Sequence, residues 1–466
     1  PHARAALGVL LVAAASLIVA CGGATATVAC HLVRGASAAP GGGSASWPYP
    51  NADLANTRDA TDSTISSANV STLRQAWTFK LTGRAAAGVR PYGSLTASPI
   101  VQDGRVYIQD LDSNVYALAL ATGRLQWEYR CDQPERSGPG PNGVAVAGGR
   151  VYGLTPTGAF ALNAATGSTI WFKRGLLDQG QGSFGIQPQV AGGRVYLASQ
   201  YGSGPGGGVL LALNASSGGV LWRFDTVVGP DPGVRSLGLG AGGAWETPLV
   251  GDDGSVTYGI GNPYQTPDAA IAHPAIELYT DSDVDLNATT GKLIWKAPVG
   301  LHNGHDTDSL EALEHRGTAL KAPLTILPGS LGGVLADPAV ADGSVYVGML
   351  DLAITYPTLK LPVATTAAGP LSGEVEALTA SRPAGSSRDT NVAQMPLGAA
   401  TVSNDLVFTT LYDGELIALN RRTGAIAATA QRPFHSGSRF SKNARTPSWM
   451  SSVENAIVSC ERRKSI

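Results

Sequence analysis

One short segment gathers side chains that could bind a metal ion or move a proton. Its histidines and carboxylates are His302, His305, Asp306, Asp308, Glu311, Glu314 and His315. Histidines three residues apart beside carboxylates could bind zinc, and a short helix over SLEALEH would bring Glu311 and His315 onto one face. The spacing of Asp306 and Asp308 also suits a hard cation, which takes several oxygen ligands. An ordinary polar loop has the same composition, so the residues alone leave these alternatives open.

The sequence lacks the motifs of several other kinds of functional site. It contains no glycine-rich phosphate loop, no Ser-His-Asp order and no nucleotide fingerprint. The four cysteines, Cys21, Cys30, Cys131 and Cys460, form no CxxC pair, metal knuckle or haem site, and we expect no disulfide framework. A formal net charge of −2 leaves no basic field for a phosphate backbone, which excludes nucleic acid as a partner.

An internal repeat supplies the elements that must position any site. Four copies, VYALALATGRLQW, AFALNAATGSTIW, LLALNASSGGVLW and DVDLNATTGKLIW, end at Trp127, Trp171, Trp222 and Trp295, and two weaker copies follow. Another strand pair such as SPIVQDGRVYIQD precedes each copy, with Asp-Gly, Gly-Gly or Thr-Gly in the turns. Units of about four strands with apolar residues at every second position predict an all-β propeller. The repeated phrase argues against an unrelated string of hairpins in a sandwich.

The repeats resemble the PQQ-type propeller repeat, and the stretch WPYPNADLANTRDATDSTISSANVSTLRQAWTF resembles the N-terminal blade of quinoprotein alcohol dehydrogenases. The resemblance runs from Trp47 to about Ala430. It implies eight blades around an axial channel that holds pyrroloquinoline quinone (PQQ) above a metal ion. About seven blades can be traced, so we expect an eight-bladed propeller or a truncated form of one.

The resemblance also assigns site residues. In GAGGAWETPLVGDDGSVTYGIGNPYQ it places Trp245 as the floor beneath the quinone and Asn262 as a metal ligand. In the segment ending HNGHDTD it places Asp306 as catalytic base and metal ligand, and Asp308 as the extra oxygen ligand of lanthanide-dependent members. Lys321, or else Arg316, is the candidate basic residue toward the quinone. The implied cofactors are PQQ and a calcium or lanthanide ion.

Several departures from the family pattern bear on activity. Asn303 stands where the family usually has an aspartate, and the metal-binding glutamate is replaced by a stretch in which Gln200, Tyr201 or Ser203 would have to approach the ion. Loss of an anionic ligand weakens a divalent site. The vicinal disulfide of many alcohol-oxidising members is missing, and Cys131 stands alone.

The N-terminal end of the chain predicts export. Residues 1–21 resemble a signal peptide with a lipobox, Ile18 to Cys21, and an ordinary hydrophobic signal with a chance cysteine is the alternative. We expect residues 22–46 to be a flexible linker, residues 47–430 to form the propeller, and residues 431–466 to be an irregular basic tail.

These expectations favour a PQQ-dependent dehydrogenase-like protein outside the cytoplasm, in the periplasm or an equivalent space, lipid-anchored at Cys21. It would oxidise an alcohol or aldehyde and pass electrons to a separate acceptor. The alternative is a non-catalytic propeller of the same repeat, acting as a binding or assembly platform of the cell envelope.

Overall fold

The structure is a computed structural model. It describes residues 30–34, 45–60, 63–83, 95–133, 143–178, 181–200, 208–228, 243–261, 277–279, 282–298, 323–326, 334, 336–356, 366–379 and 388–431. Among these residues, none forms a helix long and apolar enough to span a membrane.

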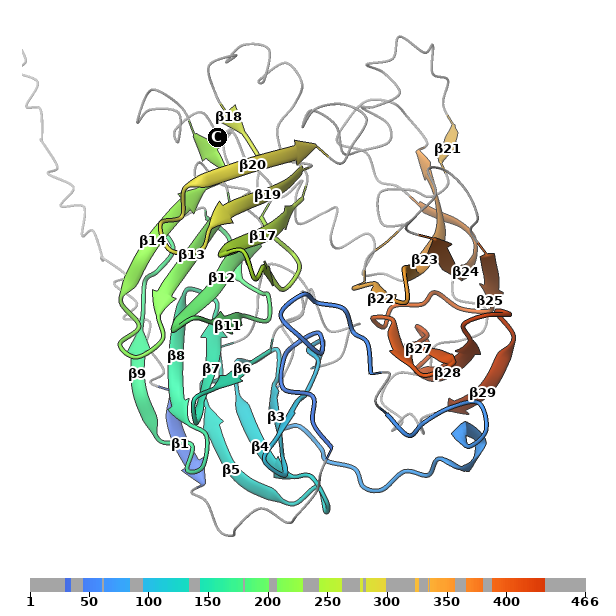
Figure 1. Cartoon of the computed structure of the whole chain (residues 1–466), viewed down its shortest axis with the longest axis horizontal. Helices are drawn as coiled ribbons and strands as arrows, with labels where there is room; N and C mark the ends of the chain where they lie inside the picture. The colour runs from blue at the N-terminus through green and yellow to red at the C-terminus, as the bar shows by residue number, and fades with distance from the viewer. Residues whose placement is uncertain are drawn as a thin grey trace, which may run out of the picture.

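The described strands form a β-propeller with six four-stranded antiparallel blades (Figure 1). Blade 1 contains β2 (Ile100–Gln102), β3 (Arg105–Gln109), β4 (Val115–Ala119) and β5 (Leu125–Arg130), and blade 2 contains β6 (Ala145–Ala147), β7 (Arg150–Thr155), β8 (Gly158–Asn163) and β9 (Thr169–Lys173). Blade 3 contains β11 (Gln189–Ala191), β12 (Arg194–Gln200), β13 (Val209–Asn214) and β14 (Val220–Asp225), with β10 (Ser183–Phe184) also paired to β12.

Blade 4 contains β16 (Leu249–Val250), β17 (Ser255–Ile260), β19 (Ser282–Asn287) and β20 (Leu293–Pro298), and β15 (Val227–Val228) pairs separately with β18 (Glu277–Leu278). Blade 5 contains β22 (Ala339–Ala341), β23 (Ser344–Tyr356), β24 (Thr366–Thr379) and β25 (Arg388–Val392), with β21 (Leu324–Ile326) added to β23. Blade 6 contains β26 (Thr401–Ser403), β27 (Leu406–Thr410), β28 (Glu415–Asn420) and β29 (Ile426–Gln431).

The repeated tryptophan joins one blade to the next. The indole nitrogens of Trp127, Trp171 and Trp222 donate to the carbonyl oxygens of Ala164, Ala215 and Ala288, each at 3.0 Å. Each indole packs on the glycine of the next blade's turn, Gly167, Gly218 or Gly291, where a Cβ would lie only 2.6 to 2.8 Å from the ring. These glycines have φ between +68° and +75°, so the turn needs glycine for its backbone and for the approach of the indole.

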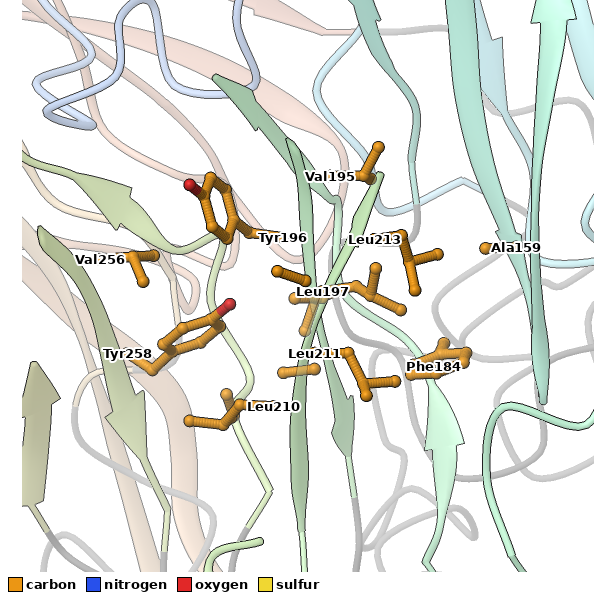
Figure 2. Packing of buried hydrophobic residues seen from close by; sticks show 14 of the residues in the cluster. Ala159, Phe184, Val195, Tyr196, Leu197, Leu210, Leu211, Leu213, Val256 and Tyr258 are labelled. Atoms are coloured by element: carbon orange, nitrogen blue, oxygen red, sulfur yellow. The ribbon is translucent and has the colours of Figure 1, made fainter. Parts of the chain in front are cut away.

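Buried side chains fill the spaces between blades. The largest cluster spans blades 2, 3 and 4 and lies on both faces of the sheet of blade 3 (Figure 2). Leu211 and Phe184 lie on one face, and Leu210 lies with Tyr196 and Tyr258 on the other. Because each blade buries its faces only against its neighbours, the repeat predicts the packing as well as the strands.

The predicted number of blades is wrong. The described residues form six blades rather than seven or eight, because the expected N-terminal blade is not a sheet. Its described part, residues 47–60 and 63–83, holds only one short 3₁₀ helix, η1 (Val70–Thr72), and isolated bridges. Trp77 nevertheless acts like a repeat tryptophan: its indole donates to Leu120 at 2.8 Å and packs on Gly123 of blade 1.

The N-terminal segment corrects two further expectations. Within the range expected to be a flexible linker, β1 (His31–Arg34) pairs antiparallel with β5 at the outer edge of blade 1. Cys30, just before β1, forms a disulfide with Cys131, just after β5. The expectation of no disulfide is therefore wrong, because the two cysteines are 101 positions apart and meet only through the pairing of β1 with β5.

Candidate functional site

Trp245 lies where the chain enters blade 4, beside the residue that precedes Asn262. Ala244 forms an antiparallel bridge with Ile260, and the Gly261 amide donates to the Gly243 carbonyl at 3.1 Å. A Cβ on Gly261 would lie 3.1 Å from the indole nitrogen of Trp245. The fold therefore brings the predicted quinone floor against the end of β17, where the predicted metal ligand follows.

Gln200, at the end of β12, borders the same segment. Its side chain is fully buried, and its amide nitrogen donates to the Gly185 carbonyl at 3.1 Å. Within the described residues its Oε1 has no hydrogen-bond donor. A Cβ on Gly243 would lie 2.8 Å from the Gln200 Cα, so glycine is needed for the two segments to pass. A buried carbonyl oxygen without a donor is the type of ligand that a hard cation takes.

A polar hub lies inside the ring of innermost strands. Arg58 is only 7% exposed, and its guanidinium donates to the Ala400 carbonyl at 2.6 Å, to Asn51 at 2.6 Å, to Ser98 at 3.1 Å and to Thr401 at 3.0 Å. These bonds tie the N-terminal segment to blades 1 and 6. In Figure 1 this dark blue segment runs through the centre, between blades 1–4 and blades 5–6.

Gln187 is the second centre of the hub. Its amide nitrogen donates to the carbonyls of Val144 at 2.8 Å and Ser98 at 2.9 Å, and its Oε1 accepts the Ser98 amide at 3.2 Å. Its backbone carbonyl accepts the Thr247 hydroxyl at 3.0 Å, while the Thr247 carbonyl accepts the Asn56 side chain at 2.7 Å. One glutamine thus links blades 1, 2, 3 and 4 beneath the segment that carries Trp245.

Two carboxyl groups face this hub. Glu246, next to Trp245, shares a side-chain hydrogen bond with Asp337 at the entry to blade 5. Burial and the neighbouring Asp337 raise the pKa of Glu246 well above its usual range. Burial lowers the pKa of Arg58, and the nearby acidic side chains of Asp337 and Glu246 oppose that effect. The hub therefore brings two acidic side chains and a guanidinium together near the axis.

Most of the predicted site residues lie outside the described part of the chain. Trp245 is described, whereas Asn262, Asp306, Asp308 and Lys321 are not, and neither is the segment from His302 to His315 with its zinc alternative. Among the described residues, no group of three or more histidines, cysteines and carboxylates could hold a metal ion. The assignments beyond Trp245 stay predictions.

The hub residues were missed at the level of sequence, although a signal for them exists. In four blades the residue just before the proline that leads into the innermost strand is polar, at Ser98, Gln187, Thr247 and Asp337. These positions meet at the axis because innermost strands enter from one end of the propeller. A polar residue directly before a proline, repeated in four blades, therefore marks the residues that lie at the axis in this chain.

Family profiles and relatives agree with the repeat. Residues 47–147 match the profile "Glucose/ethanol/alcohol dehydrogenase, beta-propeller domain", and residues 135–258 match "Outer membrane protein assembly factor BamB". The quinoprotein alcohol dehydrogenase PedH of Pseudomonas putida is 28% identical over 274 residues, 53% of this chain and 44% of the relative. A quinohemoprotein alcohol dehydrogenase of Comamonas testosteroni is 29% identical over 287 residues, 53% of this chain and 38% of the relative.

The chain carries PQQ-type β-propeller repeats over the residues that these profiles match. It resembles quinoprotein alcohol dehydrogenases at modest identity and spans about two fifths of the length of these curated relatives. Solved structures agree on the fold of this repeat protein. The quinohemoprotein alcohol dehydrogenase ADHIIG of Pseudomonas putida has a TM-score of 0.66 at 20% identity, covering 83% of this chain and 72% of that one. A europium-containing methanol dehydrogenase has a TM-score of 0.63 at 16% identity, covering 83% and 85%.

The described residues of this PQQ-repeat protein fit such a cofactor site in part. Trp245 offers a flat ring that packs against Gly261, and Gln200, whose Cα lies close to Gly243, has a side-chain oxygen without a donor among the described residues. An indole ring suits the flat face of a quinone, and an amide oxygen is a ligand type that a hard cation takes.

Proposed function

We propose that this chain is a quinoprotein dehydrogenase-like protein that works outside the cytoplasm and oxidises an alcohol or aldehyde. The observation that carries the proposal is the placement of Trp245 against Gly261, directly before Asn262. A quinone site needs a flat aromatic ring close to a metal ligand, and Trp245 packs on the residue that precedes the predicted ligand Asn262. The names of the relatives, alcohol dehydrogenases that use a quinone, support the same substrate class.

Each residue would have a defined task at this site. Bound PQQ would supply the two-electron acceptor for the substrate's hydride. Trp245 would hold the flat face of the cofactor, and Lys321 would lie toward it. Asn262, Asp306 and Asp308 would provide oxygen ligands for calcium or a lanthanide. Asp306 would also take the proton of the substrate hydroxyl, a role that a carboxylate can fill and an amide cannot.

Reconstitution tests the proposal. Purified protein is mixed with PQQ and either calcium or a lanthanide, and binding is followed by quinone absorbance and by quenching of Trp245 fluorescence. We expect the lanthanide to support tighter binding, because its higher charge compensates for the missing glutamate. Asp306→Asn should bind PQQ but fail to reduce an artificial electron acceptor with simple alcohols. If neither ion gives stoichiometric PQQ binding, the dehydrogenase proposal is wrong.

Export and anchoring are part of the proposal. The disulfide between Cys30 and Cys131 supports an oxidising compartment, where such bonds form and persist. Acylation of Cys21 would add a membrane anchor. Cys21→Ser should then move the mature protein from the membrane fraction to the soluble fraction. Retention of the cleaved Ser variant in the membrane would contradict the anchor without affecting the dehydrogenase proposal.

A second candidate is the non-catalytic envelope platform. The specific observation in its favour is the match of residues 135–258 to the profile of an outer membrane protein assembly factor. The absence of the family's metal-binding glutamate also favours it. Failure of PQQ binding in the reconstitution, combined with membrane retention through Cys21, would support this alternative.

A further inference from the structure

The junctions between blades follow one rule. The repeat tryptophan of one blade packs on the turn of the next and shares a core cluster with a leucine there, as Trp171 does with Leu213. The exposed fractions of Trp127, Trp171 and Trp222 are 0%, 9% and 7%. The leucines at the equivalent position of five blades, Leu118, Leu162, Leu213, Leu286 and Leu419, are at most 2% exposed.

The seam between blade 4 and blade 5 breaks this rule on both sides. Trp295, the repeat tryptophan of blade 4, is 43% exposed, whereas its three equivalents are at most 9% exposed. On blade 5, Leu378 is 38% exposed although it occupies the position of the buried leucines, opposite Val345 in the sheet. Val340 on β22 is 40% exposed. Within the part of the chain that the structure describes, the tryptophan side of blade 4 and the leucine side of blade 5 therefore remain uncovered along the same seam.

Direct closure of the seam is blocked at the axis. The innermost strands of blades 1 to 4 contact one another in turn, as do those of blades 5 and 6. Between β16 and β22 the N-terminal segment intervenes: the Val250 amide donates to the Leu54 carbonyl at 2.9 Å, and the Val340 amide donates to the Thr57 carbonyl at 2.8 Å. The interposed chain turns between these two bonds, with Asn56 at φ +55°, so at the axis blades 4 and 5 each bond to the N-terminal segment rather than to each other.

The charges and the sequence beside the seam indicate which kind of molecule can bind there. Lys292 and Lys296 flank the apolar residues of β20, and antiparallel pairing of two such edges around Ile294 would bring lysines opposite each other. A second copy of this chain is therefore disfavoured. Successive repeat tryptophans are 44 to 73 positions apart, whereas residues 299–323 are fewer than one unit and contain no Asn-x-x-Thr-Gly phrase.

We propose that the seam between blades 4 and 5 is a docking surface for one further repeat unit of the same type, carried by a partner polypeptide. The partner's turn seats on Trp295, with glycine at positive φ beneath the indole and a backbone carbonyl accepting the indole N–H. The aromatic side chain of the partner that corresponds to the repeat tryptophan covers Leu378. The proposal continues an interface that three tryptophans of this chain already form, and it is independent of the dehydrogenase proposal.

A hairpin copied from this chain provides the probe. Residues 159–173, with Trp171→Phe, are made as a peptide cyclised across the paired ends Ala159 and Lys173, so that the Asn163 to Gly167 turn is preserved. The peptide is titrated into the full chain, and the emission of Trp295 is taken as the difference between wild type and Trp295→Phe. We expect a saturable blue shift, because the indole leaves water. The peptide with Gly167→Val, which cannot adopt the turn easily, should bind at least tenfold more weakly.

Matched variants decide the outcome. Trp295→Ala should abolish binding of the peptide, whereas Ile426→Asp, at an exposed apolar position of the outer strand β29, should leave it unchanged. Circular dichroism checks that both variants keep the propeller. Equal binding to Trp295→Ala, or no blue shift at millimolar peptide, overturns the proposal. Dimerisation of the wild type that Trp295→Ala removes, seen by light scattering, also overturns it, since a second copy would then occupy the face.

Discussion

The indole nitrogen of Trp127 lies 3.0 Å from the carbonyl oxygen of Ala164, and both residues are buried at the junction of blades 1 and 2. The same geometry recurs at Trp171 and Trp222, so this contact is the unit from which the ring is assembled. A propeller of this kind has no single core, and its stability is close to a sum over such junctions.

The first prediction compares a buried and an exposed copy of this tryptophan. Trp127→Ala should lower the free energy of unfolding by about 3–5 kcal/mol, since it removes a large buried ring and leaves the Ala164 carbonyl without its donor. Trp295→Ala should cost less than about 1.5 kcal/mol, because the ring is 43% exposed. Urea unfolding of the two variants checks the prediction. Equal losses would contradict the rule for the junctions.

The second prediction concerns pH. Asp110 is 1% exposed, and burial raises its pKa to about 6 despite hydrogen bonds from Tyr116 and from the amides of Asp112 and Asn114. The native state therefore holds this proton more tightly than the unfolded state, whose pKa is near 3.8. The contribution of Asp110 to stability is complete below pH 4 and is lost as pH rises through 6, by about 3 kcal/mol.

Asp110→Asn tests that sign. The amide cannot ionise, so the variant should lack this loss between pH 4 and pH 7, while its oxygen can still accept the two backbone amides. Urea unfolding at several pH values gives the difference between wild type and variant. The prediction is wrong if the difference in unfolding free energy between wild type and variant does not change with pH, or if it shifts in favour of the wild type as pH rises. Asp110 would then ionise freely in the folded state.

The third prediction addresses the axial hub. Arg58→Met should lower the free energy of unfolding by about 3–5 kcal/mol, because it leaves two nearby acidic side chains and several buried acceptors without the guanidinium. Adding Glu246→Gln should restore part of the loss, since one acidic group is removed from the same site. Arg124→Met, at an exposed turn, should change stability by less than about 0.5 kcal/mol. Additive effects of the Arg58 and Glu246 changes would mean that the two groups do not interact.

The fourth prediction concerns the N-terminal disulfide. Cys30→Ala should lower the free energy of unfolding by about 2–4 kcal/mol, because Cys30 and Cys131 close a loop of about 100 residues in the unfolded chain. Reduction of the wild type with dithiothreitol should give the same loss, and the reductant should have no further effect on the variant. Non-reducing peptide mapping identifies the bond. An unchanged unfolding curve after complete reduction would show that β1 holds its place by strand pairing alone.

The sequence by itself determined the all-β propeller, the blade phrase and the tryptophan that ends it. These features are local: alternation at every second residue sets the strands, Thr-Gly sets the turns, and each blade packs only on its neighbours. It also marked Trp245, which the fold places beside Gly261, while the roles of Asn262, Asp306, Asp308 and Lys321 stay predictions.

Only the tertiary structure decided which distant residues meet. The pairing of Cys30 with Cys131, the bonds of Arg58 to blades 1 and 6, and the exposure of Trp295 beside the seam depend on how many blades form and where the N-terminal segment lies. The stretch from Trp47 to Leu81 looks like a blade in sequence, yet its described residues lie along other blades and pair with no set of strands of their own. Local patterns encode strands and turns, whereas closure of the ring depends on contacts between segments hundreds of residues apart.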